Sequence, residues 1–106
     1  SPEVVRKVAI ALYEGEINMV IHADGGVITV EVTPKEVRME LADHGKGIEN
    51  IELAMQEGYS TAPDEVRSLG FGAGMGLPNM KKCSDEMKIE STVGVGTTVT
   101  MTVYIQ

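Results

Sequence analysis

The first stretch of the chain places apolar residues with the period of a helix. Between residues 4 and 20 they recur mostly at i, i+3, i+4 and i+7, and Pro2 stands where the first turn of a helix tolerates proline. Asp24-Gly25-Gly26 follows, and glycine can adopt the positive φ that commonly ends a helix. The pattern predicts a long amphipathic helix over residues 2–23.

The rest of the chain predicts two hairpins separated by helices. Residues 27–32 are rich in β-branched side chains, and residues 36–42 alternate apolar with charged positions around the turn Thr33-Pro34-Lys35. Further along, we expect a short helix over 49–56, a glycine-rich loop over 57–76, a helix over 77–83, and strands over 86–91 and 97–105. This order predicts an α/β (α+β) two-layer sandwich, with helices on one face of a mixed β-sheet.

Composition narrows the class of protein. The 106 residues are 42% hydrophobic, which suits one domain spanning residues 1–106. The net charge is −7 and the basic residues are scattered, so we expect no nucleic-acid partner. No apolar run approaches the about 20 residues of a membrane span, and Cys83 is the only cysteine. We therefore expect a soluble, cytoplasmic protein that does not enter a membrane.

The first cluster that could carry chemistry lies in the first helix. Glu14 and Asn18 are four residues apart, so their side chains project from the same face one turn apart. An amide oxygen is a hard ligand suited to Mg²⁺, and a neighbouring carboxylate can accept a proton from a hydroxyl group or a water. The competing interpretation is an ordinary solvated helix face that also includes Glu16.

A second cluster, Asp43-His44-Gly45-Lys46-Gly47-Ile48, follows the predicted strand 36–42. Its two glycines let the backbone approach a ligand, and a buried Asp could accept a hydrogen bond from the amino group of adenine beside an apolar wall at Ile48. The competing interpretation is an Asp-Gly turn that leads the strand into a helix.

The third cluster is Gly70-Phe71-Gly72-Ala73-Gly74-Met75-Gly76-Leu77, where glycine recurs at every second position before a helix. Free backbone amides and a helix N-terminus together bind anions. The spacing matches neither G-x-G-x-x-G nor the Walker pattern, which disfavours those two phosphate-binding folds. A flexible linker is the competing interpretation.

In this order and at these separations, the clusters resemble the Bergerat-fold, or histidine-kinase-like, ATPases. Glu14-x-x-x-Asn18 resembles their N box, Asp43-x-Gly45-x-Gly47-Ile48 their first glycine box, Gly72-x-Gly74-x-Gly76-Leu77 their second, and Gly94-x-Gly96-Thr97 their closing glycine-threonine turn. The resemblance implies that Asn18 holds Mg²⁺, that Asp43 binds the adenine amine, and that Thr97 assists through water. The second glycine box would form a mobile lid over the phosphates. The implied ATP- or ADP-binding residues are Asn18, Asp43, Gly45, Gly47, Ile48, Gly72, Gly74, Met75, Gly76, Leu77 and Thr97.

Local detail favours one branch of that family. Histidine kinases generally carry Asn where this chain has Glu14, and a hydroxyl acceptor benefits from a carboxylate base. Gly58-Tyr59-Ser60-Thr61 and Gly74-Met75-Gly76-Leu77-Pro78 are similar to small anti-sigma-factor kinases, which phosphorylate a serine of an antagonist protein. The resemblance therefore implies an ATP-dependent serine/threonine kinase with Glu14 as general base and a protein partner, either an antagonist or a sigma factor. A non-catalytic partner-binding module and a fragment of a sensor histidine kinase are the alternatives.

Two features depart from the family pattern. The small kinases have a strand and a helix before the N-box helix, whereas this chain begins almost at that helix. Either the sequence is trimmed, or this is a minimal variant whose sheet edge lacks its usual neighbour. Such an edge invites homodimerisation or pairing with another domain. The second feature is Gly15 in the middle of the helix, which costs about 1 kcal/mol relative to alanine unless close packing requires it.

Overall fold

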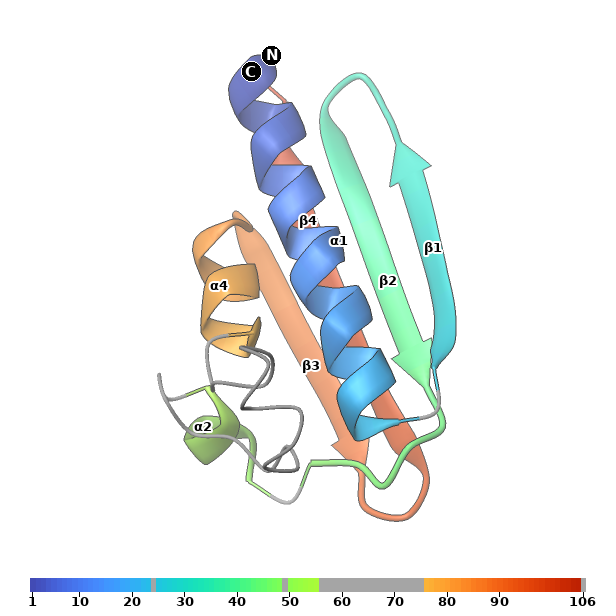
Figure 1. Ribbon diagram of the computed structural model, residues 1–106. Helices are drawn as coiled ribbons and strands as arrows, with labels where there is room; N and C mark the ends of the chain where they lie inside the picture. Colours follow the sequence, from blue (N-terminus) through green and yellow to red (C-terminus); the bar gives the residue numbers. More distant parts are fainter. Residues whose placement is uncertain (24, 49, 56–75, 106) are drawn as a thin grey trace.

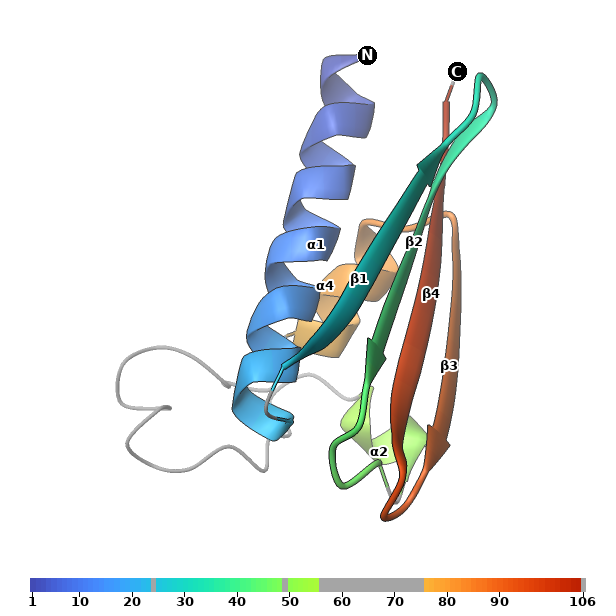
Figure 2. The same cartoon turned by 90° about the vertical axis from the view of Figure 1, so that its right-hand side faces the viewer.

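The computed structural model describes residues 1–23, 25–48, 50–55 and 76–105. These residues form two layers, with helices α1 and α4 on one face of a sheet (Figures 1 and 2). The predicted two-layer α+β sandwich is confirmed. The elements are α1 (Pro2–His22), β1 (Gly26–Val32), β2 (Glu36–Asp43), α2 (Ile51–Ala54), α4 (Gly76–Lys82), β3 (Glu86–Thr92) and β4 (Gly96–Tyr104).

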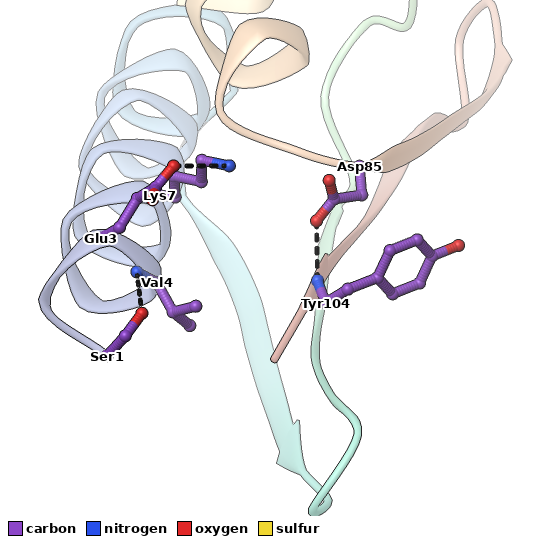
Figure 3. Close-up of polar contacts among 6 residues, drawn as sticks. All are labelled: Ser1, Glu3, Val4, Lys7, Asp85 and Tyr104. Atoms are coloured by element: carbon purple, nitrogen blue, oxygen red, sulfur yellow. Dashed lines mark hydrogen bonds and ion pairs between the residues drawn. The ribbon is translucent and has the colours of Figure 1, made fainter. Parts of the chain in front are cut away.

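Helix α1 begins and ends where its sequence predicts. The hydroxyl of Ser1 caps the N-terminus by accepting a hydrogen bond of 3.3 Å from the backbone N–H of Val4 (Figure 3). Pro2 occupies the first turn. At the other end Ala23 is extended, and its N–H donates to the carbonyl oxygen of Met19 at 2.9 Å. Gly25 then adopts a φ of 93°, so the chain can turn back into β1.

The sheet has the order β1-β2-β4-β3, and each of these neighbouring pairs is antiparallel. The predicted mixed sheet is therefore wrong in this detail for the described strands. The long connection from β2 to β3 does return the chain so that β3 runs parallel to β2. However, the hairpin between β3 and β4 inserts β4 between those two strands, so the parallel strands are not neighbours.

The core lies between the helices and the inward rows of the two central strands. In β2 the inward side chains are Val37, Met39 and Leu41, and the register places Met39 opposite Met101 of β4. Burial of these alternating side chains is the main force that holds helices to sheet. The buried apolar core consists of Ala11, Met19, Val37, Met39, Leu41, Leu77, Met80, Val99, Met101 and Val103.

Gly15 is explained by this packing. The residue is buried, and a Cβ added there would collide with Cδ2 of Leu41 and lie 3.4 Å from the sulfur of Met80. The missing side chain therefore lets α1 approach β2 and α4 closely. The expectation that close packing requires this glycine is confirmed.

The edge strand β1 is the least covered part of the sheet. All seven of its residues are exposed, and its helix-facing side chains Ile28, Val30 and Val32 retain 37%, 45% and 68% of their accessible surface. Figure 1 shows why, because α1 and α4 lie over the other strands. The opposite face of the sheet carries no helix among the described residues (Figure 2).

Candidate functional site

Asp43, the last residue of β2, is held by backbone donors from two parts of the chain. Its Oδ1 atom accepts hydrogen bonds from the N–H of Gly45 at 2.8 Å and from the N–H of Thr97 at 3.2 Å. The first bond makes an Asx turn that directs the chain out of the strand. Oδ2 makes no hydrogen bond to any described residue, so this oxygen can accept one from a ligand.

Glycine permits the close approach of the two loops at this end of the sheet. A Cβ on Gly96 would collide with the carbonyl oxygen of Asp43, and the residue has a φ of 150°. Gly47 has a φ of 81°, and a Cβ there would lie 2.6 Å from the carbonyl oxygen of Thr92. Both positions therefore need glycine, and the turn between β3 and β4 packs directly on the loop that follows β2.

A group of hydroxyls joins the same two loops. Ser91 Oγ accepts a hydrogen bond of 2.7 Å from the N–H of Ile48 and lies 2.8 Å from Oγ1 of Thr97. It also donates to the carbonyl oxygen of Gly96 at 3.3 Å. Thr97 retains only 7% of its surface. The structure thus gathers four predicted residues, Asp43, Gly45, Ile48 and Thr97, into one hydrogen-bonded unit, and Gly47 lies in its loop.

The carboxylate of Glu14, in the first cluster, lies next to the start of α4. Glu14 Oε2 lies 3.7 Å from the position that a Cβ would occupy on Gly76, so the missing side chain leaves room beside the carboxylate. Both Glu14 and Asn18 are half-buried in α1. Leu77, the next residue of α4, is buried in the core.

A cavity of about 570 Å³ lies beside the Asp43 turn. Of the predicted site residues that the structure describes, only Gly45 contributes to its wall, so the cavity lies next to the described part of the unit built on Asp43. The described residues that line it are Ile21, Ala23, Gly25, Gly26, His44, Gly45 and Lys46.

Comparisons with known proteins agree with this geometry. Residues 4–106 match the family described as "Histidine kinase-, DNA gyrase B-, and HSP90-like ATPase". The chain belongs to this family. An anti-sigma F factor of Caldanaerobacter subterraneus subsp. tengcongensis is 39% identical over 97% of this chain and 72% of its own length. An anti-sigma F factor of Clostridium acetobutylicum is 38% identical over 93% of this chain and 69% of its own length.

A solved structure supports the same fold. The mycobacterial sensor histidine kinase MprB superposes with a TM-score of 0.66 over 93% of this chain and 70% of that chain. The sequence identity is only 18%, so this likeness concerns the fold of the ATPase domain alone.

Ser91 is a member of this hydrogen-bonded unit that the sequence analysis did not name, although a signal was present. The inward positions of β3 are Met87, Ile89 and Ser91, and the last of them is polar in an otherwise apolar row. The register places it opposite Thr97, which is likewise the polar member of the inward row of β4. Two facing hydroxyls at one end of an apolar core indicate a polar site there.

Other predicted features of the ATPase domain are outside the described residues. Gly72, Gly74 and Met75 belong to this group, together with Gly58-Tyr59-Ser60-Thr61. Among the residues that are described, no group of three or more His, Cys, Asp or Glu side chains could hold a metal ion. Within the same ranges, no helix is long and apolar enough to cross a membrane.

Proposed function

We propose that this ATPase domain is a serine/threonine protein kinase of the anti-sigma-factor type, which binds ATP at Asp43 and transfers the γ-phosphoryl group to a partner protein. The observation that carries the proposal is the state of the Asp43 carboxylate. Two backbone donors fix Oδ1, while Oδ2 has no bond to a described residue and can accept one from the amino group of adenine.

In the proposed reaction the chain mainly positions the reactants. The hydroxyl oxygen of the acceptor serine forms a bond to the γ-phosphorus as the bond between that phosphorus and the β–γ bridging oxygen breaks, and ADP departs with the electron pair. Glu14 accepts the proton of the hydroxyl. Its carboxylate is half-buried, and Oε2 lies 3.7 Å from the position that a Cβ would occupy on Gly76.

The donors on α1 suit a hard divalent cation. Asn18 contributes an amide oxygen one helical turn from the carboxylate of Glu14, and Mg²⁺ prefers oxygen ligands of this kind. Asn18 is the residue proposed to hold Mg²⁺, which would neutralise charge on the phosphates.

The partner is proposed to be a sigma factor or an antagonist protein, in the cytoplasm. The relatives support a protein partner, since those proteins are named anti-sigma F factors. The exposed edge β1 supports pairing into a homodimer, because the backbone donors and acceptors on its side away from β2 have no strand partner among the described residues.

Calorimetric titration of the protein with ATP and Mg²⁺ tests the nucleotide site. We expect saturable binding, weakened roughly 10- to 100-fold in Asp43→Asn because the amide places a donor where a carboxylate oxygen accepted. The amide oxygen of the variant can still accept the bonds from Gly45 and Thr97, so the fold should survive. A folded wild type that binds no ATP would refute the nucleotide site.

Transfer of label from [γ-³²P]ATP to proteins of the source organism's extract tests the kinase. We expect phosphoserine on a partner, lost in Glu14→Ala and retained in the control Glu16→Ala, which removes an exposed carboxylate from the same helix. If ATP binds but no label is transferred, the domain is a nucleotide-dependent partner-binding module. Phosphohistidine in place of phosphoserine would indicate a fragment of a sensor kinase.

A further inference from the structure

The cavity beside the Asp43 turn touches both parts of the proposed nucleotide site. One of its walls includes Gly45, whose N–H donates to Oδ1 of Asp43 at 2.8 Å. Another wall includes Ile21 of α1, and Glu14, Asn18 and Ile21 follow one flank of that helix because they are spaced i, i+4 and i+7. A nucleotide with its adenine at Asp43 and its phosphates at Asn18 would therefore extend along this cavity.

Lys46 brings a positive charge to the cavity. Among the described residues that line it, Lys46 is the only lysine, arginine, aspartate or glutamate. Its side chain is exposed and makes no ion pair with any described residue, so the ammonium group can bind a ligand. The chain as a whole has a net charge of −7, which repels a triphosphate. A cation in the wall of this cavity offsets that repulsion where a nucleotide would lie.

The backbone that carries this charge is held in place on both sides. The carbonyl oxygen of Lys46 accepts a hydrogen bond of 2.8 Å from the N–H of Gly94, in the turn between β3 and β4. Two residues further along, the N–H of Ile48 donates to Oγ of Ser91 at 2.7 Å. When the ammonium group binds a ligand, only the side chain has to become ordered, and this lowers the entropy lost on binding.

We propose that Lys46 is a nucleotide-binding residue whose ammonium group pairs with the phosphate groups of ATP. The inference rests on the proposed ATP site. It adds a cation on the loop after β2 to the ligands proposed on α1. Lysine binds phosphate as a point charge with three rotatable donors, so the contact does not require one fixed geometry. Its effect should depend on the charge of the ligand and of residue 46, and not on the base.

Comparing ATP with adenosine isolates this contact, because adenosine has the same base and ribose but no phosphate. Dissociation constants are measured with Mg²⁺, by calorimetry for ATP and by displacement of a fluorescent ATP analogue for adenosine. Lys46→Met removes the charge and keeps an unbranched side chain. We expect it to weaken ATP binding about fivefold and to leave adenosine binding unchanged. Lys46→Arg keeps the charge and should restore most of the affinity for ATP.

Lys35→Met is the matched control. Lys35 is also exposed, and its carbonyl oxygen also accepts a backbone hydrogen bond of 2.8 Å, in this case from Ile105. It lies in the turn between β1 and β2, at the other end of β2 from Asp43. The substitution changes the net charge by the same amount as Lys46→Met, and it should leave the affinity for ATP unchanged.

Salt concentration separates a charge contact from a structural effect. Because salt screens an exposed ion pair, the difference in ATP affinity between wild type and Lys46→Met should shrink from about 0.05 M to about 0.5 M salt. This comparison also decides the question if adenosine binds too weakly to be measured.

The outcomes separate the two proposals. A folded wild type that binds neither ATP nor adenosine refutes the nucleotide site itself. If wild type binds ATP, the role of Lys46 is overturned by a Lys46→Met variant that binds ATP as wild type does. It is also overturned by a loss that is the same at both salt concentrations, that extends equally to adenosine, or that Lys35→Met reproduces. Each of these results leaves the ATP site standing.

Discussion

At both ends of the central strands an aspartate carboxylate accepts hydrogen bonds from backbone N–H groups, but only one of these ends forms the candidate site. At one end Asp85 Oδ2 accepts a hydrogen bond of 2.7 Å from the backbone N–H of Tyr104, and the carboxylate is exposed (Figure 3). At the other end Asp43 Oδ1 accepts from the N–H groups of Gly45 and Thr97, and the carboxylate is half-buried. Each aspartate satisfies backbone donors where regular pairing stops.

The difference lies in what surrounds each carboxylate. Around Asp43, glycines at 47 and 96 let two loops touch, and buried hydroxyls fix their relative position. Around Asp85 the contacts only satisfy backbone groups at the ends of strands. For example, the N–H of Asp85 donates a hydrogen bond of 2.8 Å to the carbonyl oxygen of Thr102. The Asp43 carboxylate is a candidate site because close backbone packing and part-buried hydrogen bonds fix its position, while its second oxygen can still accept a hydrogen bond from a ligand.

We expect the largest loss of stability from a substitution that forces apart the two loops at the Asp43 end of the sheet. Gly96→Ala would drive a Cβ into the carbonyl group of Asp43 at a φ of 150°. We expect a loss of about 3 kcal/mol or more of unfolding free energy, measured by urea denaturation, together with loss of ATP binding.

Gly94 is the matched control, since it belongs to the same turn and has a φ of 81° with nothing within 4 Å of an added Cβ. Gly94→Ala should cost only the backbone strain, about 1 kcal/mol. Equal losses in the two variants would show that the turn needs only the flexibility of glycine and that contact with Asp43 contributes nothing.

The sequence predicted most of the framework because the framework depends on local patterns. Apolar periodicity, β-branched segments and turn residues predicted every helix and strand that is described, including the end of α1 shortly before Gly25 and Gly26. The order of the strands in the sheet was harder to predict from the sequence. It depends on which edge of the first hairpin the last strand pairs with, and local patterns do not encode that choice.

The candidate site was predicted in part for the same reason. Asp43 and Thr97 are recognisable from motifs, but Gly26 was interpreted only as a helix terminator. In the structure a Cβ on Gly26 would collide with the carbonyl oxygen of Ala42 and lie 2.9 Å from Cε of Met19. Its need for glycine arises from contacts across the sheet, which become visible only when the strands are paired.

The second prediction compares the two aspartates directly. Asp85→Ala leaves the N–H of Tyr104 without its acceptor, but this amide is exposed and can bind water, so we expect a loss of about 1 kcal/mol by urea denaturation and no change in ATP affinity. Asp43→Ala removes the acceptor of two half-buried amides and should lower both stability and ATP affinity. If Asp85→Ala also weakened ATP binding, the two ends would be coupled and the distinction between them would fail.

The smallest expected effect is on the pH dependence of stability, and it comes from Tyr104, which lies at the same end of the sheet as Asp85. A hydrogen bond to Glu86, followed by desolvation and by the charges of Glu86, Glu36 and Asp85, raises the pKa of Tyr104 from 10.0 to about 12. The protonated phenol is favoured in the folded state, so its contribution to stability is complete below pH 10.0 and is lost as the pH rises to about 12.

The ultraviolet absorbance of tyrosinate checks this shift in a Tyr13→Phe, Tyr59→Phe background, where Tyr104 is the only tyrosine. Glu86→Gln should return the pKa towards 10.0, because it removes the carboxylate that accepts the phenolic hydrogen and carries the largest effect. Glu90→Gln is the control, since Glu90 lies further along β3 and pairs with Lys88 at 3.2 Å. If the pKa of Tyr104 is near 10.0 while Glu86 is still present, the carboxylates at this end of the sheet lie apart from the phenol. The contrast with the closely packed Asp43 end would then be sharper still.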